Sequence, residues 1–159
     1  MSRLSRETRA NRDYFAAKLR AERQIVDVIR KVKEGKGDFV LVDARGREAF
    51  ALGHIPGALC VPLPELDRLL PQLPRDRELV TYCWHDACQL SARMALELCE
   101  RGFFAKEMNA GWKEWTEQKL PIRKGEAPAG RVCCKCTGTP KTAELRRVSP
   151  IRTPRTRAA

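Results

Sequence analysis

Short apolar runs alternate with amphipathic segments between residues 37 and 124, and this alternation constrains the fold more than any other feature. Residues 39–43 (Phe-Val-Leu-Val-Asp) are apolar almost without a break, as in a strand buried on both faces. Residues 78–83 (Glu-Leu-Val-Thr-Tyr-Cys) predict a second strand, and residues 59–61 and 105–108 predict two weaker ones. Strands separated by helices predict an α/β fold, with a parallel central sheet and helices on both faces.

The helices are predicted from apolar residues that recur at intervals of three and four. Residues 11–34 predict one helix, because positions 25, 28, 29 and 32 are apolar and share a face before Gly35 ends the pattern. The other predicted helices cover residues 48–52, residues 64–70, residues 88–101 with Leu90, Met94 and Leu98 on one face, and a last segment that carries Trp112 and Trp115.

Basic side chains are concentrated at the two ends of this 159-residue chain, whose net charge is +11. Residues 1–36 carry 11 basic and 5 acidic side chains and residues 131–159 carry eight and one, whereas residues 37–130 carry 12 and 14. No aromatic platform or recognition helix accompanies the charge, which argues against nucleic acid as a partner. Residues 125–159 contain Gly, Pro, Thr and Arg without a period, and we expect a basic, disordered tail.

The seven cysteines are odd in number, and their spacing fits no small disulfide scaffold. The first residues lack the apolar core of a secretory signal, so we expect a cytoplasmic protein with reduced thiols. No apolar run approaches the roughly 20 residues that span a bilayer, so we expect no membrane association. The tail cysteines Cys133, Cys134 and Cys136 lack a nearby fourth zinc ligand. We therefore expect no metal and no cofactor, and leave open whether these cysteines relay sulfur or are incidental.

Three stretches, in the right order and spacing, resemble the signatures of the rhodanese-like domain family. Asp-Ala-Arg at residues 43–45, followed by Gly-His-Ile-Pro-Gly-Ala at residues 53–58, resembles the first signature. Val-Thr-Tyr-Cys at residues 80–83 resembles the strand that delivers the family's nucleophilic cysteine, and Gly-Trp at residues 111–112 resembles the start of the closing signature.

The resemblance covers about residues 38–123 and implies a rhodanese-like sheet. It divides the chain into a basic helical lead-in at residues 1–36, a rhodanese domain at residues 37–124 and the tail. Tyr-Cys-Trp at residues 82–84, with a second cysteine in the loop, is similar to single-domain bacterial members.

Cys83 is the candidate nucleophile, because it follows a central parallel strand directly before a helix, where α/β proteins bind their ligands. We expect the backbone N–H groups of the loop to point at its sulfur and to lower its pKa. The resemblance implies a sulfurtransferase that moves sulfane sulfur from a small donor such as thiosulfate to cyanide or a thiol, which includes a protein thiol, through a persulfide on Cys83. The predicted substrate-binding loop is Trp84, His85, Asp86, Ala87 and Cys88.

The loop departs from the commoner family pattern, because it carries acidic Asp86 where many members have Arg or Lys. We therefore expect thiosulfate to be a poor donor. Related phosphatases and arsenate reductases need an Arg six residues after the cysteine, and Gln89 occupies that position here, which argues against their chemistry.

Several side chains outside the loop have plainer interpretations. We expect His54 to be a hydrogen-bonded turn residue, and Asp43 with Arg45 to be a salt-bridged pair that holds the loop above the sheet. Cys60 and Cys99 are expected to be inert packing thiols.

Three alternatives to catalysis remain open from the sequence. In the first alternative, Cys83 is simply a buried strand cysteine. In the second, the domain is a non-catalytic binding or regulatory module. In the third, Cys83 and Cys88 form a thiol-redox sensor with Cys88 as the resolving thiol, although Cys88 equally well fills space under the loop.

Overall fold

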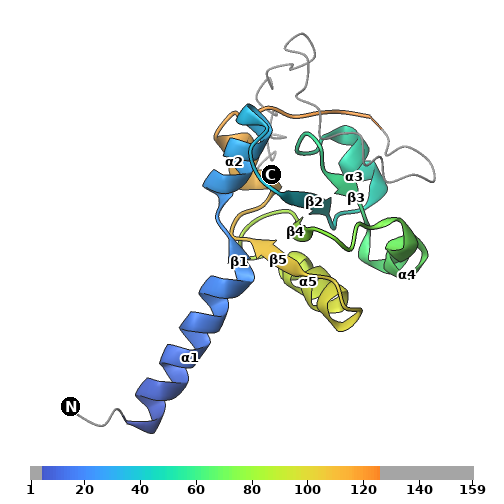
Figure 1. Cartoon of the computed structure of the whole chain (residues 1–159). Coiled ribbons are helices and arrows are strands. Elements are labelled where there is room, and N and C mark those ends of the chain that lie inside the picture. The colour runs from blue at the N-terminus through green and yellow to red at the C-terminus, as the bar shows by residue number, and fades with distance from the viewer. Residues whose placement is uncertain (1–4, 126–159) are drawn as a thin grey trace, which may run out of the picture.

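Five parallel strands form one sheet in this computed structural model, which describes residues 5–125 (Figure 1). The strand order across the sheet is β1-β5-β4-β2-β3. The four strands that the sequence predicts are confirmed, within a residue at their ends, as β2 (Phe39–Asp43), β3 (Leu59–Cys60), β4 (Glu78–Tyr82) and β5 (Ala105–Met108).

Helices cover both faces of the sheet, as predicted. On one face α2 (Ile25–Glu34) and α6 (Trp112–Glu117) enclose a core that contains Val28 and Trp115. On the other face α4 (Leu66–Leu69) and α5 (Leu90–Glu100) bury Leu66, Met94 and Leu98. Helix α3 (Arg47–Leu52) follows β2, and 3-10 turns at Leu63–Glu65 and Leu70–Gln72 flank α4.

The single helix predicted over residues 11–34 is wrong, because the fold divides it in two. Helix α1 (Arg6–Ala21) ends before β1 (Glu22–Arg23), which pairs with the end of β5, and α2 then begins at Ile25. Pairing with a sheet edge outweighs the helical preference of these two residues, a tertiary effect that periodicity does not show. The predicted end of the helix at Gly35 is confirmed, with φ of 68°.

Helix α1 extends away from the sheet (Figure 1), and none of its residues is buried. Tyr14, Phe15 and Leu19 are exposed on it. The division of the chain at residue 36 stays a prediction. Within residues 5–125, none of the helices combines the length and apolar character needed to cross a lipid bilayer.

The two-residue period of the strands decides which side chains meet under α5. Leu79 of β4 and Ala105 of β5 belong to the core on the α5 face, so Thr81 and Glu107, two residues further along each strand, turn toward the same face. Thr81 and Glu107 are also partners in the parallel register. Cys83 continues this face beyond the end of β4.

Candidate active site around Cys83

The candidate nucleophile lies in the tight connection between β4 and α5. Cys83 is fully buried, the segment from Trp84 to Ala87 is exposed, and Cys88 is half-buried. A backbone hydrogen bond of 3.0 Å from Cys88 N to His85 O closes the turn. The predicted loop residues are therefore together in one turn, over a sulfur that lies inside it.

The loop is held in place by hydrogen bonds from the first two residues of α6. Trp112 N donates to Cys83 O and Lys113 N donates to Trp84 O, both at 2.8 Å. Gly111 permits this approach, because a Cβ atom there would lie 2.4 Å from His85 N and 2.7 Å from the carbonyl carbon of Trp84. The backbone of the cysteine loop thus rests directly on the backbone of Gly111.

The Cys83 thiol faces oxygen atoms in this structure. Its Sγ lies 3.3 Å from Cys88 O, 3.9 Å from His85 O and 3.3 Å from Ser91 Oγ. Burial raises the pKa of Cys83, and its hydrogen bond with Cys88 acts in the same direction, whereas hydrogen bonds with Ser91 oppose the rise. The expected depression of the Cys83 pKa is therefore wrong, because the cost of burying a thiolate outweighs the hydrogen bonds from Ser91 that favour it.

Cys88 has the environment that the sequence suggested for Cys83. Burial alone would raise the pKa of Cys88, but hydrogen bonds from the Cys83 thiol and from the backbone N–H groups of Leu90 and Trp84 outweigh this effect and lower it. Cys88 is thus the readier thiolate of the two in this conformation. Its role as a resolving thiol stays a prediction.

Two polar residues next to the thiol, Ser91 and Glu107, were not singled out from the sequence. Ser91, on the first turn of α5, is 2% exposed, and its Oγ lies 2.6 Å from Glu107 Oε1 on β5. A signal was available, because Ser91 shares a face with Met94 and Leu98 at helical spacing and is the one polar position of those three.

The predicted Asp43–Arg45 ion pair is confirmed and belongs to a buried network. Arg45 Nε and Nη2 donate to Asp43 at 2.9 and 2.6 Å, and Nη2 also donates to Gly53 O at 2.7 Å. The Tyr82 hydroxyl donates to Asp43 Oδ2 at 2.6 Å and accepts from Ile55 N at 3.1 Å. The network joins the end of β2 to the end of β4 and to the turn after α3.

Arg45 also supports the cysteine loop from one side. Its guanidinium carbon lies 5.0 Å from the ring centre of Trp84 and 4.6 Å from that of Trp112. Because the guanidinium is 1% exposed and engaged by Asp43 and Gly53, it positions the loop without offering a free cation to a substrate anion.

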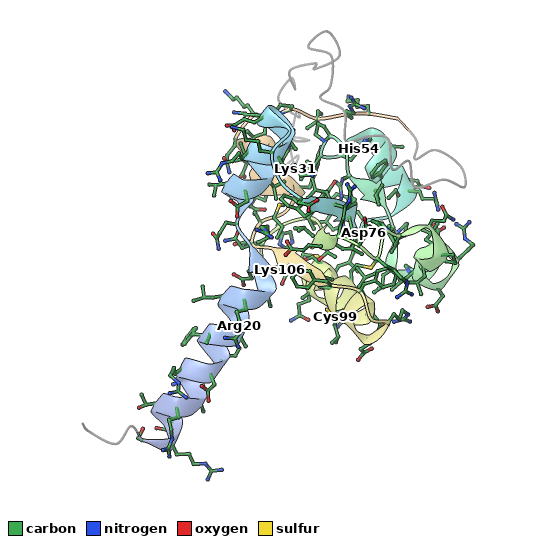
Figure 2. The ribbon with its side chains drawn as sticks, in the orientation of Figure 1. Arg20, Lys31, His54, Asp76, Cys99 and Lys106 are labelled. Carbon is green, nitrogen blue, oxygen red and sulfur yellow. The ribbon has the colours of Figure 1, made fainter. Side chains whose placement is uncertain are left out.

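The plainer interpretations of other residues are largely confirmed. His54 Nδ1 lies 2.9 Å from Phe50 O, and its ring stacks on the Phe50 ring (Figure 2 labels His54 beside α3). Cys60 is buried, and burial raises its pKa to about 11, so it is an inert packing thiol.

Cys99 is exposed on α5 (Figure 2), so the prediction that it is a packing thiol is wrong. The helix turns its side chain away from the buried face that Leu98 occupies. The tail and its three cysteines lie outside the described residues.

Known proteins with similar sequences include regulators and enzymes. An HTH-type transcriptional regulator of Mycobacterium tuberculosis is 36% identical over 94 residues, which are 59% of this chain and 41% of the regulator. The thiosulfate sulfurtransferase GlpE of Shewanella oneidensis is 35% identical over 78 residues, which are 48% of this chain and 75% of the relative. This chain thus spans less than half of the regulator's length.

The fold and the family agree with these similarities. The crystal structure of the BH2092 protein from Bacillus halodurans matches with a TM-score of 0.66 and 28% identity, over 74% of this chain and 86% of that one. The family model described as rhodanese-like domain matches residues 13–118, which include β1 to β5 and the cysteine loop. This chain belongs to the rhodanese-like domain family.

Proposed function

We propose that this chain is a sulfurtransferase that carries sulfane sulfur as a persulfide on Cys83. The observation that supports this most is the position of Cys83, which is buried at the carboxyl end of β4 under a short exposed loop. Sulfurtransferases are among the relatives at modest identity. A cytoplasmic location, which keeps thiols reduced, is part of the proposal.

The chemistry proceeds in two displacements. The Cys83 thiolate attacks the outer sulfur of thiosulfate, the S–S bond of the donor breaks, and sulfite leaves with the bonding electron pair. The persulfide on Cys83 then gives its outer sulfur to cyanide or to a thiolate, and the Cys83 thiolate returns. Burial keeps water and stray thiols away from the persulfide between the two steps.

Removal of the nucleophile tests this proposal. Cys83→Ser is expected to lower thiocyanate formation from thiosulfate and cyanide by at least about a thousandfold, because the thiol that carries the transferred sulfur in this proposal is removed. Cys99→Ser is the control: it removes an exposed thiol near the end of α5, the helix that follows the Cys83 loop, and should keep the full rate. Activity of Cys83→Ser within a few fold of the wild type would assign the transfer to another residue.

The donor preference follows from the charge of the loop. Asp86 is exposed at the loop tip, and no Lys or Arg lies between Cys83 and Gln89. Asp86→Lys is therefore expected to raise kcat/KM for the dianion thiosulfate by roughly tenfold at low salt, and the gain should fall as salt is added.

Asp76→Lys is the matched control for this charge effect. Asp76 is exposed before the first residue of β4, at the opposite end of that strand from Cys83, and carries the same change in charge. An equal gain for Asp76→Lys, or no gain for Asp86→Lys, would show that the loop charge does not set the donor.

A thiol-redox function is the second candidate, favoured by one observation. The Cys83 Sγ atom lies 3.3 Å from the Cys88 carbonyl oxygen, and the lowered pKa of Cys88 favours its thiolate next to the buried Cys83 sulfur. Oxidation of either sulfur would then allow a disulfide between the two. The similarity to a transcriptional regulator leaves a non-catalytic regulatory role as the remaining alternative.

A further inference from the structure

We propose that Glu107 is a specificity-determining residue, whose negative charge near Cys83 disfavours the dianion thiosulfate and leaves neutral organic persulfides, R–S–SH, as the preferred sulfur donors. The inference rests on the proposed sulfur transfer through Cys83 and names the class of donor. Glu107 does not contact the reacting sulfur, because the Ser91 hydroxyl lies between them, so it acts through its charge.

The carboxylate of Glu107 lies one hydroxyl group away from the sulfur of Cys83. Glu107 Oε1 accepts from Ser91 Oγ at 2.6 Å, and Ser91 Oγ lies 3.3 Å from Cys83 Sγ. The carboxylate is thus within about 6 Å of the sulfur, where repulsion between two unit negative charges slows a reaction between about threefold, at the dielectric constant of water, and about a hundredfold, at an effective value of 20.

Ionisable groups on other elements respond to the charge of Glu107. Its carboxylate opposes the lowering of the Cys88 pKa in the loop, and it helps to raise the pKa of Lys18 on α1. Lys18 Nζ also lies 3.3 Å from Glu22 Oε1, and Glu22 of β1 is the register partner of Glu107. Lys18, Glu22 and Glu107 together carry one net negative charge, so Lys18 does not cancel the charge near Cys83.

The atoms in contact with the sulfur offer no compensating positive charge. Cys83 Sγ lies 3.3 Å from Cys88 O and 3.9 Å from His85 O, so two carbonyl groups present their negative ends to it. Hydrogen bonds with Ser91 favour the thiolate, but Ser91 is neutral. Within residues 5–125, no side-chain nitrogen forms a hydrogen bond with this sulfur. An anionic donor therefore meets electronegative surroundings at Cys83.

The two classes of donor differ in the charge that they bring to these surroundings. Thiosulfate adds two negative charges to that of the Cys83 thiolate. With a neutral persulfide, the thiolate attacks the outer sulfur of R–S–SH, the S–S bond of the donor breaks, and R–S⁻ leaves with the bonding electron pair. The product is Cys83–S–SH, and the total charge stays at −1 throughout. Glu107 therefore slows the reaction of thiosulfate more than that of the persulfide.

Two alkylating reagents of similar size and different charge measure this effect without a sulfur donor. Iodoacetamide is neutral and iodoacetate carries one negative charge, and both react with the thiolate, so the ratio of their rates at Cys83 does not depend on its pKa. Glu107→Gln removes the charge but keeps an acceptor for Ser91. It is expected to raise the rate with iodoacetate, relative to iodoacetamide, by about tenfold. Fragment-ion mass spectrometry of the tryptic peptide 78–93 distinguishes Cys83 from Cys88.

Two further variants distinguish the charge of Glu107 from its shape and from charge elsewhere. Glu107→Asp keeps the charge on a shorter side chain, so its rate ratio should stay within about threefold of the wild type. Glu100→Gln removes an exposed charge at the far end of α5 and should keep the wild-type ratio. An unchanged ratio in Glu107→Gln, or an equal shift in Glu107→Asp, would show that the charge of Glu107 does not act on Cys83.

Sulfur loading with two donors separates this inference from the proposed function. The rate at which Cys83 gains sulfur is measured by intact mass with thiosulfate and with 2-hydroxyethyl persulfide. Glu107→Gln should raise the thiosulfate rate relative to the persulfide rate by at least about tenfold. Loading by both donors with an unchanged ratio would refute the donor selection and leave the sulfurtransferase intact. A shifted alkylation ratio in a protein that neither donor loads would support the charge effect and refute sulfur transfer.

Discussion

Arg45→Met is expected to lower the free energy of unfolding by about 3–5 kcal/mol, because it leaves a buried carboxylate without its counter-charge. Asp43 is completely buried and receives the Arg45 guanidinium and the Tyr82 hydroxyl. Without Arg45, Gly53 O also loses its donor, and the Trp84 and Trp112 rings lose the cation between them. Urea unfolding followed by circular dichroism measures the loss.

Arg47→Met is the matched control, two residues further along the chain. Arg47 forms a two-pronged ion pair with Glu65, with both bonds at 2.7 Å, but this pair lies at the surface. Water compensates the loss of a surface pair, so Arg47→Met should unfold close to the wild type. Similar losses for both variants would contradict the view that the buried network holds β2 to β4.

Gly111→Ala is expected to destabilise the protein by about 1–3 kcal/mol and to reduce sulfur transfer by at least about tenfold. The added Cβ would overlap His85 N, His85 Cα and the carbonyl carbon of Trp84 at 2.4 to 2.7 Å. These are backbone atoms, which cannot turn aside as the end of a side chain does. Because φ of Gly111 is −133°, which any residue adopts, the overlap alone causes the effect.

Gly46→Ala provides the comparison for this variant. A Cβ at Gly46 meets nothing within 4 Å, so this substitution should change the stability by less than about 1 kcal/mol. Thiocyanate formation and thermal unfolding, measured on both variants, separate displacement of the loop from a general loss of stability. Full activity in Gly111→Ala would show that the position of the Cys83 loop does not depend on its close backbone contact with Gly111.

The sequence predicts the parts of the fold that are determined by burial along the chain. β2 and β4 are buried on both faces, and the apolar, β-branched and aromatic residues that dominate both segments identify them as strands without any knowledge of their neighbours. β1 was not predicted, because Glu22 and Arg23 form a strand only by pairing with β5, which is more than 80 residues away in the sequence. No local pattern records such a pairing.

The candidate site was predictable in position but not in its electrostatics. The strand–cysteine–helix order located Cys83 and its loop, and the ion pair of Asp43 and Arg45 was predicted from the motif. The direction of each backbone carbonyl in the turn depends on φ and ψ angles that the sequence does not specify. The pKa of Cys83 is therefore raised where the sequence predicted a lowered one, and the place of Glu107 beside Ser91 follows from the register of β5 with β4, which the sequence does not show.

Intact-mass analysis after incubation with thiosulfate or mercaptopyruvate, followed by peptide mapping, tests the central claim most directly. The account predicts a gain of one sulfur atom, about 32 Da, on the peptide that contains Cys83, reversed by cyanide. Cys83→Ser should gain no sulfur, and Cys88→Ser should still gain it on Cys83. Equal sulfur loading of wild type and Cys83→Ser, or loading of the wild type at another cysteine only, would contradict the account.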